Sequence, residues 1–430
     1  MSVAVHHPTS VKFVDSRPRR EGFAAALRIR VAASTPLASL LAVLDQGLIS
    51  GTSFLTSVVI GRCCGAETLG FYALIYAALA MLLGLQEQLT TAPYVMNHRK
   101  QRGRALQKYA GSVAVHQAIF TAIACVGLVI LWMSDTGTQP TLHKLLPTLL
   151  IAIPMLLLRA FVREFALAHC DVLTVLAVDI AVCMTQAVVV ASLYLTDAVN
   201  LTTLYATLAV ACFLTVVVWA KHNRHRFIFD LRSTAVHWRR NWRFGRWALA
   251  THLAGTSTPY VMPWVLFAVH GEKEAGLLAA CSVVVGLANI LLSALADFLT
   301  PRAAAAYAVG GVVGLRRVLK SMTLLSLLTI GGICVIAFLF GPQLISVLYA
   351  GRFSEAGSLV GLLTLAVLAN ALGNVAGNGL WAINQPRANF SADLAKLTAA
   401  IAGANIDFGL VEKFHESGFL GSLGVSIRLY

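Results

Sequence analysis

Charge is the scarcest property of this 430-residue sequence, because Asp, Glu, Lys and Arg together make up only 12% of it. A soluble globular protein carries about 25% charged residues. Hydrophobic residues make up 58% of the chain, and its mean hydropathy is +0.75. Apolar runs of about 18 residues or more, the length that a helix needs to cross a bilayer, recur along the chain. The composition therefore excludes a soluble globular protein and indicates an integral membrane protein.

Motifs that would supply covalent or metal chemistry are also missing. The sequence contains no Walker loop, no zinc-binding motif and no nucleophile motif. Its eight cysteines form no C-x-x-C and no metal spacing, and most lie in apolar runs, where cysteine behaves as a small hydrophobic residue. We therefore expect no metal, no cofactor and no direct use of ATP, and we predict that the chain is not an enzyme.

Ten apolar segments are expected to cross the membrane as helices. Their runs are continuous, whereas a membrane β-barrel shows segments of about ten residues that alternate in polarity. The segments are 36–61, 68–96, 109–133, 142–168, 172–195, 200–221, 245–270, 275–300, 320–341 and 355–384. Prolines at positions 147, 154, 259 and 263 are expected to kink or locally unwind the fourth and seventh segments.

Positive charge collects in alternate connecting segments. The exceptions among the 33 Lys and Arg residues are four: Arg62, Lys144, Lys273 and Arg352. Cytoplasmic segments of membrane proteins are enriched in Lys and Arg, so we expect a multi-pass protein of the bacterial inner membrane with both termini in the cytoplasm. This distribution also accounts for the net charge of +14 without a nucleic-acid partner.

The longest basic segment, residues 222–244, lies between the sixth and seventh apolar segments. We expect it to lie on anionic membrane lipids, with Trp238, Trp242 and Trp247 at the interface. A specific site for a lipid phosphate or a partner protein is the alternative.

Two hairpins in the chain resemble each other. Gly65 to Gly70 (GAETLG) joins the first two apolar segments, and Gly271 to Gly276 (GEKEAG) joins the seventh and eighth. Both hairpins begin on the same side of the membrane, which indicates a parallel repeat about an axis along the membrane normal. The expected fold is therefore an all-α integral membrane protein with about ten transmembrane helices in two parallel-repeat bundles, six helices and an incomplete second half.

The domain boundaries follow from these segments. The chain is expected to comprise a cytoplasmic basic segment (1–35), a six-helix bundle (36–221), a cytoplasmic basic loop (222–244), a bundle of four helices (245–386) and an atypical tail (387–430). The longest apolar run of the tail, residues 397–404, is too short to cross a bilayer. We therefore expect the last two helices of the second half to be missing.

Polar residues inside the apolar segments are the candidates for function. A charge at the centre of a membrane helix costs about 2.5–3.5 kcal/mol on insertion scales, so it usually faces a cavity or a partner. The candidates for a substrate or ion cavity are Asp45, Gln46, Glu87, Gln88, Asp179 and Asp297. Each carboxylate can bind a proton or Na⁺, and a structural hydrogen bond between helices is the alternative for each.

Arg159 and Arg163 are candidates for binding a phosphate group. They lie four residues apart, on one face of the fourth helix, and a guanidinium can form paired hydrogen bonds with phosphate. The alternative is a helix end whose arginines reach toward the membrane surface. We expect His116 and His252 to be satisfied by neighbouring helices.

The run from Asp45 to Val95 resembles the opening hairpin of polysaccharide flippases. The features that carry the resemblance are GTSF at 51–54, GRxxG at 61–65, GFYAL at 70–74 and the stretch from LQ at 85–86 to APY at 92–94. These flippases share a superfamily with multidrug and toxin extruders and with the lipid II flippase. Members typically have twelve or more helices in two bundles around a central cavity, so the resemblance also implies a C-terminally truncated chain.

The resemblance implies a transporter that flips undecaprenyl-diphosphate-linked oligosaccharide across the inner membrane for surface polysaccharide biosynthesis. The implied partners are the lipid-linked oligosaccharide, membrane lipids and proteins of polysaccharide assembly. Two alternatives are a cation-coupled multidrug extruder of the same superfamily and a truncated, inactive relative. A membrane polysaccharide polymerase or ligase is a further alternative, which the short outer links disfavour.

Overall fold

The computed structural model describes residues 35–134, 140–256, 258–353 and 356–383, with single residues between 388 and 398. The described residues form helices and no strand. The helices are α2 (Thr35–Gln86), η1 (Glu87–Thr91), α3 (Ala92–Asn97), η2 (His98–Lys100), α4 (Gly103–Ser134), α5 (Pro140–Ala168), α6 (Val172–Leu195), α7 (Leu201–Asn223), η3 (Arg224–Arg226), α8 (Leu231–Thr256), α9 (Thr258–His270), α10 (Glu272–Tyr349) and α11 (Gly357–Ala382).

Each of the ten predicted apolar segments falls on these helices. Seven helical segments among the described residues are long and apolar enough to cross a membrane, and one of them, residues 43–97, contains both helices of the first predicted hairpin. α2 and α10 are 52 and 78 residues long, which is too long for one crossing at 1.5 Å per residue. Each contains one residue with non-helical backbone, Gly65 in α2 and Gly311 in α10. The all-α membrane fold is thus confirmed.

Three of the prolines lie inside continuous helices, so the helices do not unwind there. α5 continues through Pro147 and Pro154, and α9 continues through Pro263. The seventh predicted segment covers the end of α8 and the whole of α9, and the structure describes it on both sides of residue 257.

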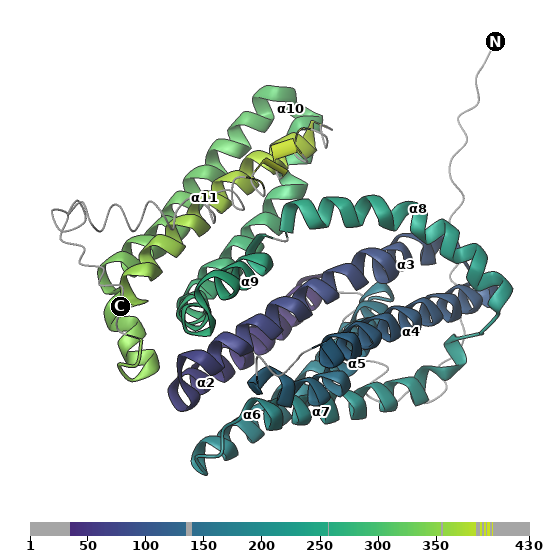
Figure 1. The fold of residues 1–430 in the computed structure, drawn as a ribbon. Coiled ribbons are helices and arrows are strands. Elements are labelled where there is room, and N and C mark those ends of the chain that lie inside the picture. The colour runs from purple at the N-terminus through teal and green to yellow at the C-terminus, as the bar shows by residue number, and fades with distance from the viewer. Residues whose placement is uncertain are drawn as a thin grey trace.

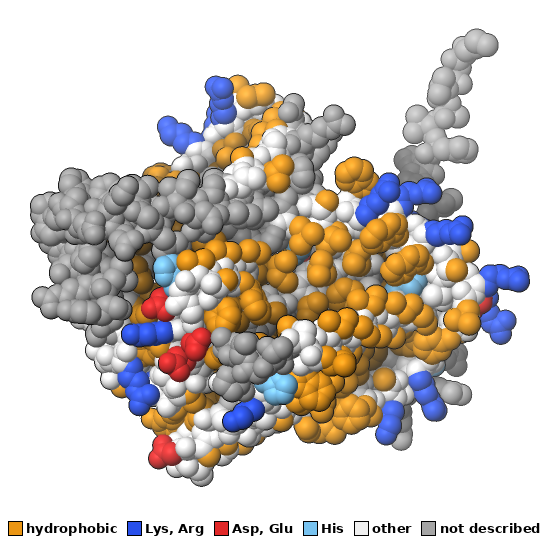
Figure 2. Space-filling model, viewed as in Figure 1, with side chains coloured by type: hydrophobic (Ala, Val, Ile, Leu, Met, Phe, Trp, Pro, Cys, Tyr) orange, Lys and Arg blue, Asp and Glu red, His pale blue; other side chains and the backbone are white. Residues whose placement is uncertain are grey.

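The predicted basic loop at 222–244 is largely helical, since α8 begins at Leu231. Figure 1 shows α8 running along one edge of the molecule, from the bundle of α2 to α7 toward α9, α10 and α11. In Figure 2, hydrophobic side chains cover most of the middle of the visible face, and Lys and Arg lie mainly near its edges. This distribution suits a protein whose middle faces lipid.

The two halves of the chain pack together at one end of the molecule. The largest hydrophobic cluster joins α2, α5 and α7 of the first half to α10 and α11 of the second, and includes Ile60, Leu149, Leu204, Ala280 and Val360. At the other end the clusters belong to single halves: one around Tyr94, Tyr109 and Phe165, and one around Leu299, Met322 and Val375.

Arg62 contributes a polar link between the halves at the packed end. Its Nε donates to the carbonyl oxygen of Leu348 at 2.5 Å, and its Nη2 donates to that of Val347 at 2.7 Å. Both acceptors lie in the last turn of α10, where carbonyl groups have no intrahelical partner. The halves are therefore joined at this end by apolar packing and by a charged donor at a helix C-terminus.

Candidate functional site

Four of the predicted site residues meet in one cluster. Asp45 comes from α2, Arg159 and Arg163 from α5, and Asp179 from α6. The three helices pack against one another, and the four-residue spacing places both arginines on the face of α5 that points to α2 and α6. We call these four residues the Asp–Arg cluster.

Asp179 is the centre of the Asp–Arg cluster. Its Oδ1 lies 2.5 Å from Nη2 of Arg159, and its Oδ2 lies 2.7 Å from Nε of Arg163. Nη2 of Arg163 also lies 3.0 Å from Oδ2 of Asp45. Arg163 therefore bridges two carboxylates, and Asp179 bridges two guanidinium groups.

The carboxylates of the cluster are buried, its arginines are partly buried, and its formal charges balance. Asp179 is 0% exposed and Asp45 is 6% exposed. Two carboxylates face two guanidinium groups, which compensates charges that would be costly to bury alone. Four of its buried atoms have no hydrogen-bond partner among the residues that the structure describes: Oδ1 of Asp45, Nε of Arg159, Nε of Arg163 and Oδ2 of Asp179. The last two face each other as an ion pair, so Oδ1 of Asp45 and Nε of Arg159 are left without any contact of this kind. The hydrogen-bonding capacity of the cluster is therefore not fully used by its own residues.

The other predicted site residues lie apart from this cluster. Gln46 is exposed and its side chain donates to Ser50 at 3.4 Å. Glu87 is exposed and Gln88 is half-buried, both in the π-helical turn η1. The side chain of Asp297 lies outside the described residues. The structure thus brings together four of the eight candidates.

Buried amides near η1 were not among the predicted residues. Gln86 is 1% exposed and donates to the carbonyl oxygen of Leu157 at 3.1 Å. Thr90 and Gln117 lie 3.3 Å apart, and Gln117 donates to Thr121 at 3.2 Å. The available signal was an amide side chain within an apolar run, which marks a helix-to-helix contact. Residues 86–88 are three successive polar residues, which cannot all lie on one face of a helix. Part of this stretch therefore packs against neighbouring helices.

The two histidines inside apolar segments contact other helices. His116 is buried, its Nε2 lies 3.2 Å from the carbonyl oxygen of Thr234, and its ring meets Trp238 edge to face. The ring of His252 lies directly over Gly84, because a methyl group added to that glycine would lie only 2.2 Å from Nε2 of His252. The prediction that His116 is satisfied by a neighbouring helix thus holds for Nε2, whereas the buried Nδ1 has no hydrogen-bond partner among the residues that the structure describes.

The fold matches those of solved membrane transporters. The lipid II flippase MurJ in an inward closed conformation is 13% identical with a TM-score of 0.65, covering 87% of this chain and 81% of MurJ. An inward-facing structure of a multidrug resistance MATE family transporter of the MOP superfamily is 12% identical with a TM-score of 0.63, covering 81% and 83%. An outward-facing structure of such a transporter is 14% identical with a TM-score of 0.57, covering 88% and 91%.

Sequence comparison adds nothing to these matches, since no family model and no curated protein matches the chain. At 12–14% identity the structural matches show a shared fold. The chain is thus a multi-pass membrane protein with the fold of MOP-superfamily transporters.

Proposed function

We propose that this protein is a membrane transporter that flips a lipid-diphosphate-linked oligosaccharide outward across the bacterial inner membrane, in the synthesis of surface polysaccharide. The observation that carries the proposal is the Asp–Arg cluster, which places two guanidinium groups inside a transporter fold. The partly buried Arg159 and Arg163 are suited to a diphosphate because each can form paired, charge-assisted hydrogen bonds. The flippase MurJ, whose fold this chain shares, supports the same substrate class.

In this conformation the carboxylates occupy the guanidinium groups. A diphosphate that enters must compete with Asp45 and Asp179 for Arg159 and Arg163. If Asp45 takes up a proton, it loses its charge and releases Nη2 of Arg163 to the substrate. Loss of that proton restores the ion pair and displaces the substrate. Proton uptake and diphosphate binding are therefore coupled through one arginine.

The packing of the two halves of the chain supports a mechanism for opening the transporter to each side of the membrane in turn. They are joined at the end of the molecule that contains Gly65 and Gly271, and the scarcity of Lys and Arg in these links supports an orientation with this end away from the cytoplasm. At the opposite end each half has its own hydrophobic cluster, and the halves meet there through α8, whose Gly245 packs on Gln88. This arrangement supports access from the cytoplasm in the present conformation and export after the halves rock about the joined end.

A multidrug extruder is the second candidate, because MATE transporters share the fold. The two functions differ in the charge of the molecule that is transported. A diphosphate needs the arginines, whereas a cationic drug needs free carboxylates, and Asp45 and Asp179 are both paired with arginine. The pairing favours the anionic cargo.

The test uses purified protein in liposomes that contain a fluorescent undecaprenyl-diphosphate disaccharide. Dithionite added outside bleaches only the outer leaflet, so flipping appears as additional bleaching. We expect flipping by the wild type and at least tenfold slower flipping by R159K/R163K, which keeps both charges but loses the planar forks. The matched control R316K/R317K changes two exposed arginines of α10 and should flip at the wild-type rate.

Two outcomes decide against the proposal. Folded wild-type protein that moves a cationic dye but not the lipid-linked sugar would establish the extruder instead. Equal rates for R159K/R163K and the wild type would remove the Asp–Arg cluster from substrate binding.

A further inference from the structure

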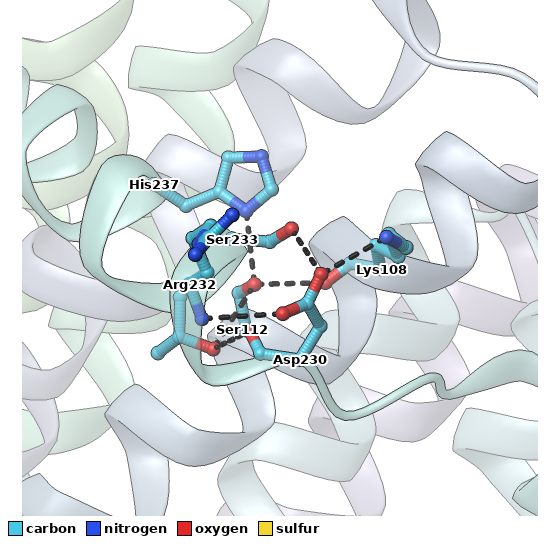
Figure 3. Close-up of polar contacts among 7 residues, drawn as sticks. Lys108, Ser112, Asp230, Arg232, Ser233 and His237 are labelled. Carbon is cyan, nitrogen blue, oxygen red and sulfur yellow. Dashed lines mark hydrogen bonds and ion pairs between the residues drawn. The ribbon is translucent and has the colours of Figure 1, made fainter.

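The start of α8 is fixed to α4 by a polar network (Figure 3). Asp230 caps the helix: Oδ1 accepts from the backbone N–H of Arg232 at 3.2 Å, and Oδ2 accepts from Ser233 Oγ at 2.7 Å. Lys108 of α4 donates to the same Oδ2 at 2.9 Å. The hydrogen bonds from Lys108 and Ser233 lower the pKa of Asp230 well below its usual range. The cap is therefore charged at physiological pH.

The face of α8 that points to the bundle is polar or small. Thr234, Asn241 and Gly245 recur at helical spacing and are all buried. A methyl group at Gly245 would lie 2.8 Å from the carbonyl oxygen of Gln88 in η1. This close approach fixes the rotation of α8 about its axis, so its other faces point away from the bundle.

The opposite face of α8 presents a stripe of arginines. Arg232, Arg239, Arg243 and Arg246 follow one another at intervals of seven, four and three residues, and all four are exposed. No Asp or Glu occurs between Leu231 and Thr256. We call these four residues the arginine stripe.

Aromatic side chains flank the arginine stripe. Trp238 and Trp242 stack with ring centroids 6.3 Å apart and are 40% and 44% exposed. Trp247 on the other flank is 69% exposed. Exposed tryptophans in membrane proteins concentrate where the headgroups meet the acyl chains. An acidic partner protein would account for the arginines, but a bilayer accounts for the arginines and the tryptophans together.

We propose that the outer face of α8 binds anionic phospholipid headgroups of the bilayer, with the arginine stripe on the phosphates and the tryptophans at the headgroup boundary. The neighbours of α8 along the chain support the bilayer as the occupant. The segment 201–226 before it is apolar enough to cross the membrane, and the helix from Tyr260 to His270 after it is also apolar. α8 therefore connects two membrane-embedded segments at headgroup level, where each arginine near an anionic surface strengthens binding by about fivefold.

The test measures quenching of tryptophan fluorescence by brominated lipids in liposomes that contain the full chain. Brominated phosphatidylglycerol is exchanged against brominated phosphatidylcholine at constant total lipid. We expect the wild type to select phosphatidylglycerol over phosphatidylcholine by at least tenfold at 50 mM salt, and less at 500 mM, because salt screens charge. R239Q/R243Q/R246Q should lose most of this selectivity.

Two variants separate this reading from loss of fold or altered topology. R239K/R243K/R246K keeps the positive charge and should keep the selectivity. R316Q/R317Q/K320Q removes three exposed charges from α10 and should also keep it. Equal quenching by the two lipids in the wild type, or undiminished selectivity in folded R239Q/R243Q/R246Q, would overturn the proposal. The result does not depend on which cargo the protein moves.

Discussion

Gly65 and Gly271 have nearly the same backbone conformation, with φ and ψ of 84° and −174° in the first and 93° and −173° in the second. Positive φ favours glycine, so the same residue stands at the same turn of both hairpins. Five residues after each turn, a glycine packs against the other link. A methyl group at Gly70 would lie 2.3 Å from the carbonyl oxygen of Glu272, and one at Gly276 would lie 2.0 Å from that of Ala66. The contact is therefore reciprocal, as a two-fold axis between the hairpins requires.

A side chain at either glycine should force the joined end apart. We expect G70V and G276V each to destabilise this packing by about 1–3 kcal/mol, the usual cost of overpacking. The measurement is the rate at which a membrane-impermeant maleimide labels Cys64, in protein whose other cysteines are replaced by serine. Cys64 immediately precedes the first link and is half-buried, so labelling should become at least fivefold faster.

Gly51 and Gly286 supply the matched controls for this experiment. Both lie in the same helices as the tested glycines, and a methyl group at either position meets nothing within 4 Å. G51V and G286V should therefore leave the labelling rate unchanged. Unchanged labelling in G70V and G276V as well would show that the glycines do not hold the joined end closed.

The helices could be placed from the sequence because each long apolar run has only one stable form in lipid, a helix. The Asp–Arg cluster could be predicted only in part. The spacing of Arg159 and Arg163 places them on one face, but their partners depend on how helices far apart in the chain pack. Asp45 is 118 residues from Arg163, and nothing local encodes that contact.

Gln86, Glu87 and Gln88 illustrate the same limit. Adjacent helical residues point in different directions, and only the position of neighbouring helices decides which one is buried. The structure buries Gln86 against α5 and exposes Glu87, which the sequence predicted as a residue of the cavity. The periodic pattern of apolar residues that predicts a helix was also weak in α8. The buried face of this helix is polar, while its exposed faces carry Trp and Arg.

Asp179 should matter more to stability than Asp45. Asp179 lies within 2.7 Å of both arginines, whereas among the described residues Asp45 forms an ion pair with Arg163 alone, and Arg163 keeps Asp179 as a second partner. Removing one partner of a buried ion pair costs about 3–5 kcal/mol because a buried charge is left uncompensated. We expect D179N to lower the unfolding free energy by an amount in this range, and the loss caused by D45N to be about 2 kcal/mol smaller. Unfolding of the detergent-solubilised protein measures both losses.

The exposed residue Glu67 provides the control, since E67Q should leave the unfolding free energy unchanged. The double variant D45N/R163Q should be no less stable than R163Q alone, because it removes both members of one pair. Equal losses for D45N and D179N would contradict the central position of Asp179.

Tyr109 should hold α8 against the first half. It is fully buried, and its hydroxyl lies 3.0 Å from both the carbonyl oxygen of Pro93 and Oδ1 of Asn241 in α8. We expect Y109F to cost about 1–3 kcal/mol, because it leaves buried polar groups without a partner. Unfolding of the detergent-solubilised protein measures the loss, and Y76F, at a tyrosine that is 53% exposed, should show none.

The attachment of α8 should weaken in mild acid through His237. Its Nδ1 lies 2.9 Å from Oγ of Ser112, while burial and the nearby Arg240 lower its pKa, against an opposing effect of Asp230. A histidine whose folded pKa is lowered is held neutral by the fold. The contribution of His237 to the stability of this attachment is fully present above the pKa of about 6.5 that a histidine has in the unfolded chain. That contribution is lost as the pH falls through the pKa of His237 in the folded protein.

Hydrogen exchange of the backbone amides between residues 231 and 241 measures this effect at pH 7.5 and pH 5.5, after correction for the intrinsic rates. We expect opening to become up to about tenfold more frequent at pH 5.5, since a proton bound one unit below the unfolded pKa shifts the equilibrium by no more than that. H237Q keeps a polar side chain but cannot titrate, so its opening should no longer depend on pH through this position. His116 also contacts α8, through Thr234, and a pH dependence that survives in H237Q would assign the effect to His116 instead.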